Sequence, residues 1–115
     1  FQDIPSQIDT ALAHRQAEPA TRLSHLVHVS PRTLLYRITR RSTVRVNSSH
    51  HQSVHTVPTS MLVSGVAPDG VIEAIEAPRH PFLLGVQWHP EFLYDRYAMH
   101  RRVFLAFVHA ARKEA

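Results

Sequence analysis

The segment Pro81-Phe82-Leu83-Leu84-Gly85-Val86-Gln87-Trp88-His89-Pro90-Glu91 combines a strand with a candidate reaction centre. Residues 81–88 are short, mostly apolar and bounded by prolines, a pattern that predicts a buried strand. Because Pro90 disfavours helical backbone at the preceding residue, His89 is expected to stay extended at the end of that strand, with Glu91 just beyond a turn. A histidine whose ring is held by a nearby carboxylate is the base-and-orienter half of a nucleophilic triad. The nucleophile is not in this segment.

The composition is that of ordinary globular material. The 115 residues are 43% hydrophobic and 19% charged, which fits one domain with a single core. No apolar run approaches the roughly 20 residues that span a bilayer, and no signal-peptide pattern opens the chain, so we expect a cytoplasmic protein with no membrane partner. The absence of cysteine excludes disulfides, thiolate metal sites and a cysteine nucleophile within these residues.

The net charge of +4 comes mainly from two groups of arginines, within 37–45 and 96–102. A nucleic-acid-binding surface would combine such groups with interleaved aromatic residues or a recognisable binding module. The sequence has neither feature. We therefore interpret these arginines as solvated surface and expect no nucleic-acid partner.

Local patterns predict two further strands and a short helix. Alternating residues predict a strand over 24–29, and a second short apolar run predicts another over 44–48. Apolar residues spaced i, i+1 and i+4 predict a helix over 33–38, with Thr33 or Ser30 as its N-cap.

A hairpin is predicted in the middle of the chain. Pro68-Asp69-Gly70 joins two apolar-rich runs, and proline and glycine together favour a tight turn. Residues 61–67 and 71–77 are therefore expected to pair antiparallel. By contrast, 1–24 is polar and proline-containing, and we interpret it as a surface connection.

The carboxyl-terminal segment predicts one long amphipathic helix. Residues 93–113 lack proline and glycine, and apolar residues recur there at helical spacing. We expect this stripe to pack on the sheet; its members are Leu93, Tyr97, Phe104, Phe107, Val108 and Ala111. Trp88 and Tyr97 are both interpreted as core aromatics.

The count of elements suggests an incomplete domain. Parallel sheets need helical crossovers on both faces, and this chain supplies one long helix for four or five strands. The chain also begins at Phe1 rather than at methionine, which favours a fragment. An isolated half-domain would expose a central sheet edge, so we expect it to be poorly soluble or oligomeric when purified alone.

Four segments together resemble the class I glutamine amidotransferase superfamily, and within it the peptidase C26 type. They are VNSSHHQ at 46–52, APDGVIEA at 67–74, GVQWHPE at 85–91 and FQDIP at 1–5. Their order and spacing match from end to end. The resemblance implies an α/β fold, the carboxyl-terminal part of a flavodoxin-like glutamine amidotransferase domain with a β-hairpin and a C-terminal helix. Residues 1–115 would then form a partial domain without its nucleophile-bearing N-terminal part.

The resemblance also implies roles for particular residues. His89 matches the triad histidine of the family and Glu91 its triad acid. A loop that lies near the substrate pocket in relatives is matched by Asn47, Ser48, His50 and Gln52. The family cysteine lies upstream in a Gly-x-Cys-x-Gly elbow, which this sequence lacks. The implied reaction is hydrolysis of a γ-glutamyl amide bond, such as that of γ-glutamyl-γ-aminobutyrate, with neither a metal nor an organic cofactor.

Two other functions stay open at this stage. The chain could be the glutaminase half of an amidotransferase that supplies ammonia to a synthase partner, or a non-catalytic binding remnant. The residues of the His-His-Gln and Gln-Trp-His-Pro-Glu motifs favour the hydrolase. A fused or adjacent synthase sequence would favour the glutaminase, and a gene that starts near Phe1 would favour the remnant.

The sequence disfavours two other chemistries, a serine nucleophile and a zinc site. No Gly-x-Ser-x-Gly elbow exposes a serine nucleophile, although three serines lie near histidines: Ser48, Ser49 and Ser53. Four histidines lack the cysteines or clustered carboxylates that specify a zinc site: His50, His51, His55 and His89. The remaining histidines are interpreted as surface residues.

Overall fold

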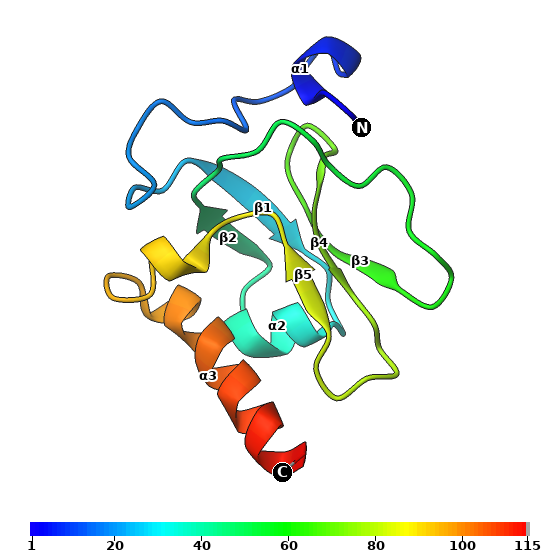
Figure 1. Ribbon diagram of the computed structural model, residues 1–115, viewed down its shortest axis with the longest axis vertical. Helices are drawn as coiled ribbons and strands as arrows, with labels where there is room; N and C mark the ends of the chain where they lie inside the picture. The colour runs from blue at the N-terminus through cyan, green and yellow to red at the C-terminus, as the bar shows by residue number, and fades with distance from the viewer. Residues whose placement is uncertain (115) are drawn as a thin grey trace.

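Five strands, three α-helices and one 3-10 turn make up the part of the chain that the computed structural model describes, residues 1–114 (Figure 1). Along the chain they are α1 (Ile4–Gln7), β1 (His25–Val29), α2 (Leu34–Thr39), β2 (Thr43–Val46), β3 (Leu62–Val66), β4 (Ile72–Glu76), β5 (Leu84–Val86), η1 (Pro90–Phe92) and α3 (Ala98–Glu114). The prediction of an α/β arrangement with a C-terminal helix is confirmed.

The strands form one sheet in the order β2-β1-β3-β4-β5, and each neighbouring pair is antiparallel. In the centre, Val27 of β1 lies opposite Val44 of β2, and Val29 lies opposite Gly65 of β3. Figure 1 shows the sheet curling, with α2 and α3 side by side near one end and α1 near the other. Antiparallel neighbours can be joined by short connections, so this sheet forms with few crossover helices.

The predicted hairpin is confirmed as β3 and β4. Gly70 has φ of +88°, a conformation that glycine adopts without steric cost. The backbone N–H of Gly70 donates to Ala67 O, and Ala67 N–H donates to Val71 O across the turn. Asp69 Oδ1 accepts from Val71 N–H, so its side chain closes the turn from within.

Helix α2 begins where its sequence predicts. Thr33 is the N-cap, and its hydroxyl oxygen accepts from Tyr36 N–H at 3.0 Å. The two preceding helical N–H groups, of Leu34 and Leu35, donate to the buried carboxylate of Glu76 in β4. A carboxylate at a helix N-terminus is stabilised by the helix dipole, so Glu76 ties α2 to the sheet.

The core lies between the sheet and the helices. Its main cluster contains Val27, Val29, Leu35, Val44, Val46, Ala74 and Trp88. The prediction of a core role for Trp88 is confirmed, whereas Tyr97 is only half-buried. A second cluster joins Ile4 of α1 to Ala67 and Val71 beside the hairpin turn. The interpretation of 1–24 as a surface connection is therefore wrong for Ile4, which is fully buried.

Two predicted strands are shorter than expected. The run 81–88 forms a strand only at Leu84–Val86, and both of these side chains are half-buried because β5 is the edge of the sheet. The run 44–48 ends as a strand at Val46. The next residue, Asn47, lies beyond the strand. Its side chain forms hydrogen bonds with backbone groups of Ala20 and His89, which are distant in the sequence.

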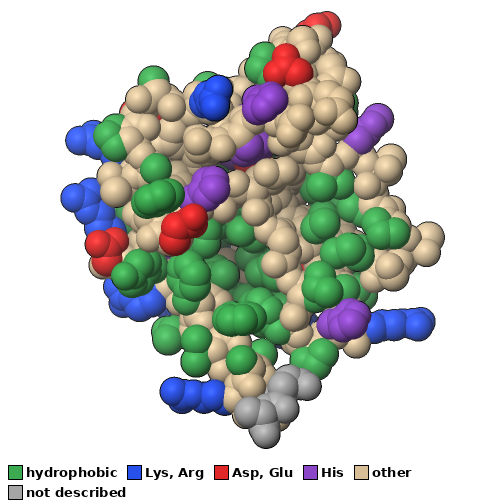
Figure 2. Space-filling view, viewed as in Figure 1, with side chains coloured by type: hydrophobic (Ala, Val, Ile, Leu, Met, Phe, Trp, Pro, Cys, Tyr) green, Lys and Arg blue, Asp and Glu red, His purple; other side chains and the backbone are tan. Residues whose placement is uncertain are grey.

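The predicted packing of the C-terminal stripe holds for Leu93, which is fully buried, and is wrong for most of its members on the helix. Helix α3 starts at Ala98, after η1, and rests on α2 and on the end of the sheet through Met99, His100 and Val103. Most of the stripe is exposed instead: Phe104 (39%), Phe107 (55%), Val108 (44%) and Ala111. Figure 2 shows apolar side chains gathered over the lower half of the molecule. None of the helices described in 1–114 is long and apolar enough to cross a membrane.

Substitution of Gly65 by alanine is expected to destabilise the sheet. A Cβ at this position would lie 2.9 Å from Val27 Cγ1 and 3.1 Å from Ala74 Cβ, both in the closely packed core. Such overpacking typically costs about 1–3 kcal/mol of unfolding free energy, which urea denaturation measures. The control is Gly85→Ala, where the nearest atom would be 3.5 Å away. Equal stability of the two variants would contradict this account of the packing.

His100 is expected to make stability depend on pH. Burial lowers the pKa of this imidazole from its ordinary value of 6.5, although its bond to the Arg45 carbonyl acts in the opposite direction. A lowered folded-state pKa means that the stabilising contribution is present above pH 6.5 and is lost as the pH falls below it. His100→Gln keeps a donor for the Arg45 carbonyl but does not titrate. Wild type should therefore lose more unfolding free energy than this variant on acidification. His109→Gln, on the exposed side of α3, should follow wild type, and a constant difference between wild type and His100→Gln would contradict the prediction.

Candidate functional site

His89 and Glu91 lie together at the carboxyl end of β5. His89 is the residue before η1, and Pro90 opens the tight turn that brings Glu91 back toward the histidine. His89 Nδ1 and Glu91 Oε2 are 3.1 Å apart. The two side chains are 40% and 52% exposed, so the pair stands at the surface. With Nδ1 directed at the carboxylate, Nε2 is the nitrogen that remains for exchange with another group.

Asn47 holds the backbone of His89 from both sides. Its Oδ1 accepts from His89 N–H at 2.8 Å, and its Nδ2 donates to His89 O at 3.0 Å. Nδ2 also donates to Ala20 O at 2.7 Å, and the residue is 1% exposed. Asn47 therefore fixes the position of the histidine relative to β2. This is a positioning contact, and it differs from the substrate contact that the resemblance implies.

Asn47→Ala is expected to destabilise the protein by about 1–3 kcal/mol, because it leaves backbone groups of His89 without buried partners. Urea denaturation measures this loss. The control is Ser49→Ala, two residues along the same loop and exposed, which should change the unfolding free energy by less than about 0.5 kcal/mol. An Asn47→Ala protein as stable as the control would show that the clamp is dispensable.

The other three loop residues face different surroundings. Ser48 is buried; its hydroxyl donates to His14 O and lies 3.2 Å from His25 Nε2. Its hydroxyl is thus engaged inside the protein. His50 and Gln52 instead line a hollow of about 510 Å³ whose wall is formed by Phe1, Gln2, His50, His51, Gln52, Ser53, Val54 and Gln87.

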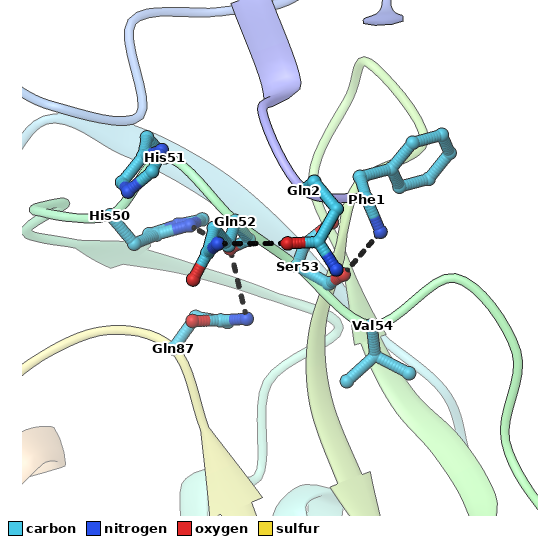
Figure 3. Close-up of a pocket in the computed structure, with 8 residues that line it drawn as sticks. All are labelled: Phe1, Gln2, His50, His51, Gln52, Ser53, Val54 and Gln87. Carbon is cyan, nitrogen blue, oxygen red and sulfur yellow. Dashed lines mark hydrogen bonds between the residues drawn. The ribbon is translucent and has the colours of Figure 1, made fainter.

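The wall of this hollow combines amide and imidazole side chains with Phe1 and Val54 (Figure 3). Gln52 Nε2 donates to Gln2 Oε1 at 3.3 Å, and Gln87 Nε2 lies 3.5 Å from Gln52 O. His89 and Glu91 are outside the wall, but Gln87 precedes His89 by two residues on the same edge of the sheet. Among the six predicted residues, the structure therefore groups His89, Glu91 and Asn47, and separately His50 and Gln52.

A group of buried histidines is not recognised from the sequence patterns. His14, His25 and His100 are buried, so their interpretation as surface residues is wrong. His14 and His25 surround Glu73, a carboxylate in the apolar hairpin strand β4. The two glutamates of β4, Glu73 and Glu76, lie among apolar residues in a core strand, and this is the signal that could have pointed to the group, since a buried carboxylate requires partners.

The fold resembles that of a solved archaeal protein. The structure matches a protein described as a GMP synthase subunit, from Thermoplasma acidophilum, with a TM-score of 0.66 and 15% identity, over 87% of this chain and 48% of that one. At this identity the match concerns the fold. The sheet and the terminal helix share this fold, and together with the sequence relatives they place the chain in the class I glutamine amidotransferase superfamily.

The family follows from the sequence comparisons. The peptidase C26 family matches residues 1–91, and the chain belongs to that family. It is 38% identical over 113 residues to a glutamine amidotransferase-like protein of Rickettsia prowazekii, covering 97% of this chain and 39% of that protein. It is 43% identical over 67 residues to the gamma-glutamyl-gamma-aminobutyrate hydrolase of Escherichia coli K12, covering 58% of this chain and 26% of the hydrolase. The chain thus spans less than half the length of each of these relatives.

Proposed function

We propose that this chain is the carboxyl-terminal part of a γ-glutamyl C–N hydrolase that works through a Cys-His-Glu triad. The observation that carries the proposal is the His89 and Glu91 pair, 3.1 Å apart at the end of β5 and clamped to β2 by Asn47. Membership of the peptidase C26 family supports the reaction class. The cysteine would come from polypeptide N-terminal to Phe1, since these 115 residues contain none.

His89 would move protons at two stages. In the first, it would hold the cysteine as thiolate while the sulfur attacks the γ-carbonyl carbon of the substrate. The imidazolium would then protonate the amine as the C–N bond breaks, leaving a thioester. In the second stage, Nε2 would take a proton from water as the water attacks the thioester, releasing the γ-glutamyl carboxylate and the free thiol. Glu91 would hold the ring through Nδ1 and stabilise its charged form.

Exposed apolar side chains and an open sheet edge support the proposal that this chain is part of a larger domain. Large apolar side chains are exposed on α3 and near η1, including Leu105 (59%), Phe107 (55%) and Phe92 (48%). The edge strand β5 also has one side unpaired within the described sheet. Contiguous apolar surface and open edges of this kind are normally covered by other polypeptide. We infer that the N-terminal part of the same domain covers them.

The polar hollow is proposed to receive the γ-glutamyl group. Amide side chains of Gln52 and Gln87 face it, and such groups can bind the charged α-amino and α-carboxylate ends of a small substrate. No metal or organic cofactor enters this reaction, because the thiol, the imidazole and the carboxylate supply its steps.

A second candidate function is the glutaminase step of an amidotransferase. The Rickettsia prowazekii relative is named as glutamine amidotransferase-like, which favours this alternative, in which a synthase partner would receive the ammonia. The resemblance of the loop motifs to the hydrolases favours the first candidate. Both functions use the same triad, so they differ only in the leaving amine and in the need for a partner.

The test is an assay of the longer protein that we propose includes this chain. We expect hydrolysis of γ-glutamyl-γ-aminobutyrate without a partner, with kcat/KM at least about tenfold above that for glutamine. Glutamine hydrolysis that depends on a synthase would reject the hydrolase in favour of the second candidate. A protein with its cysteine in place but inactive on both substrates would favour a binding remnant.

A further inference from the structure

The carboxylate of Glu73 lies buried among three histidines from separate parts of the chain. Glu73 Oε1 is 3.1 Å from His25 Nε2 and 3.7 Å from His14 Nδ1, and Oε2 is 3.1 Å from His50 Nε2. The side chains of Glu73, His14 and His25 are 0%, 2% and 8% exposed. Four segments therefore meet here: the loop at 14, β1, the loop after β2, and β4.

Each histidine uses its other ring nitrogen on an acceptor. His14 Nε2 lies 2.6 Å from Asp69 Oδ2, His25 Nδ1 lies 2.9 Å from Leu26 O, and His50 Nδ1 lies 3.0 Å from Gln52 O. Carbonyl and carboxylate oxygens only accept, so these nitrogens carry the protons. In a neutral ring, the nitrogen of His14 or His50 that faces Glu73 then has a lone pair, whereas His25 Nε2 also lies 3.2 Å from the Ser48 hydroxyl oxygen.

These inward atoms do not satisfy one another by hydrogen bonding. Among the described residues, both oxygens of Glu73, Nδ1 of His14 and Nε2 of His50 are buried without a hydrogen-bond partner of acceptable direction. A buried carboxylate that faces histidine nitrogens without hydrogen bonds to them calls for a positive charge between them.

We propose that His14 Nδ1, His25 Nε2 and Glu73 bind one divalent metal ion of the zinc type. The three ligand atoms lie within 4.8 Å of one another. A tetrahedral ion with bonds of about 2.0–2.1 Å would place its ligands roughly 3.3 Å apart, close to the two separations observed around Oε1. Imidazole donors favour zinc and its transition-metal neighbours over magnesium and calcium, which prefer oxygen ligands.

The surroundings are those of a metal site. Asp69 binds the far nitrogen of His14, which is the carboxylate-histidine-metal arrangement that orients a ligand. The charges also balance, since a divalent ion offsets Glu73 and Asp69. The site is distinct from the His89 and Glu91 pair, and it differs from the expectation of no metal, which considered His50, His51, His55 and His89.

Its burial indicates a structural role. The ion would fasten the segment around His14 to the sheet, and the Ser48 hydroxyl, which donates to His14 O, extends that connection to the loop after β2. This loop carries Asn47 and Gln52. Metal binding would therefore stabilise the clamp on His89 and one wall of the polar hollow.

The test is stoichiometric metal binding by the purified, chelator-stripped protein. We expect one zinc ion per chain by elemental analysis, and cobalt(II) should give the visible absorption of a tetrahedral site that zinc abolishes. His25→Gln and Glu73→Gln should weaken zinc binding at least about 100-fold in titrations. The control His28→Gln removes an exposed histidine from the same strand and should bind like wild type.

The wild-type titration decides the question even if a variant fails to fold. No stoichiometric uptake of zinc or cobalt by the wild-type protein would overturn the proposal and leave protonated histidines as the partners of Glu73. Equal loss of binding in His28→Gln would overturn it as well, because the metal would then be held by surface histidines. None of these readouts depends on enzymatic activity, so the metal site and the hydrolase proposal can fail separately.

Discussion

Replacement of His89 by glutamine is expected to lower kcat about 10³–10⁴-fold in the protein that supplies the cysteine. Nε2 of His89 is the group that would accept the thiol proton, protonate the leaving amine and activate water, so its removal affects both chemical stages. Glutamine keeps the polar bulk of the side chain but cannot exchange a proton near neutral pH. Steady-state hydrolysis of γ-glutamyl-γ-aminobutyrate measures the loss.

The fold should survive this change. His89 is held through its backbone by Asn47, and its side chain is 40% exposed, so unfolding free energy should move by less than about 0.5 kcal/mol. The matched control is His80→Gln, an exposed histidine in the turn before β5, which should retain full activity. Undiminished kcat in His89→Gln would remove the histidine from the reaction.

Replacement of Glu91 by glutamine should have the second largest effect, a loss of kcat on the order of 10²–10⁴-fold. The carboxylate accepts the Nδ1 proton of His89 at 3.1 Å, which leaves Nε2 as the basic nitrogen. A glutamine amide can donate to Nδ1 instead, and the ring would then carry its proton on Nε2, where it cannot act as a base.

A shorter carboxylate at position 91 separates orientation from charge. Glu91→Asp shortens the side chain but keeps an acceptor, so it should recover part of the activity lost in Glu91→Gln. Glu91 is 52% exposed, and neither variant should lower the unfolding free energy appreciably. A Glu91→Gln enzyme with wild-type kcat would mean that the tautomer of His89 is fixed by another group.

Features that depend on neighbouring residues could be predicted from the sequence. The hairpin follows from Pro68-Asp69-Gly70, the start of α2 follows from Thr33, and the closeness of His89 to Glu91 follows from the turn at Pro90. Each of these arrangements forms within a few residues. Their physical causes, a fixed proline φ, a glycine with positive φ and a capping hydroxyl, are all local.

Features that depend on distant residues could not be predicted. The apolar side chains of α3 have helical spacing, but the spacing does not state what covers them, and Phe107 is 55% exposed here. Asn47 contacts the backbone of His89, which lies 42 positions away, so the sequence around Asn47 did not indicate this contact. The approach of His14 and His25 to Glu73 likewise depends on how the segments pack, because the three residues lie in widely separated parts of the chain.

The most direct test of the central claim is the pH dependence of cysteine alkylation by iodoacetamide in the protein that joins this chain to its nucleophile. We propose that His89 acts on that thiol, so the wild-type cysteine should react as thiolate well below its usual pKa of about 8.5. In His89→Gln the midpoint of the alkylation profile should rise toward about 8.5. Identical profiles for wild type and His89→Gln would contradict the account, because the imidazole would then have no influence on the nucleophile.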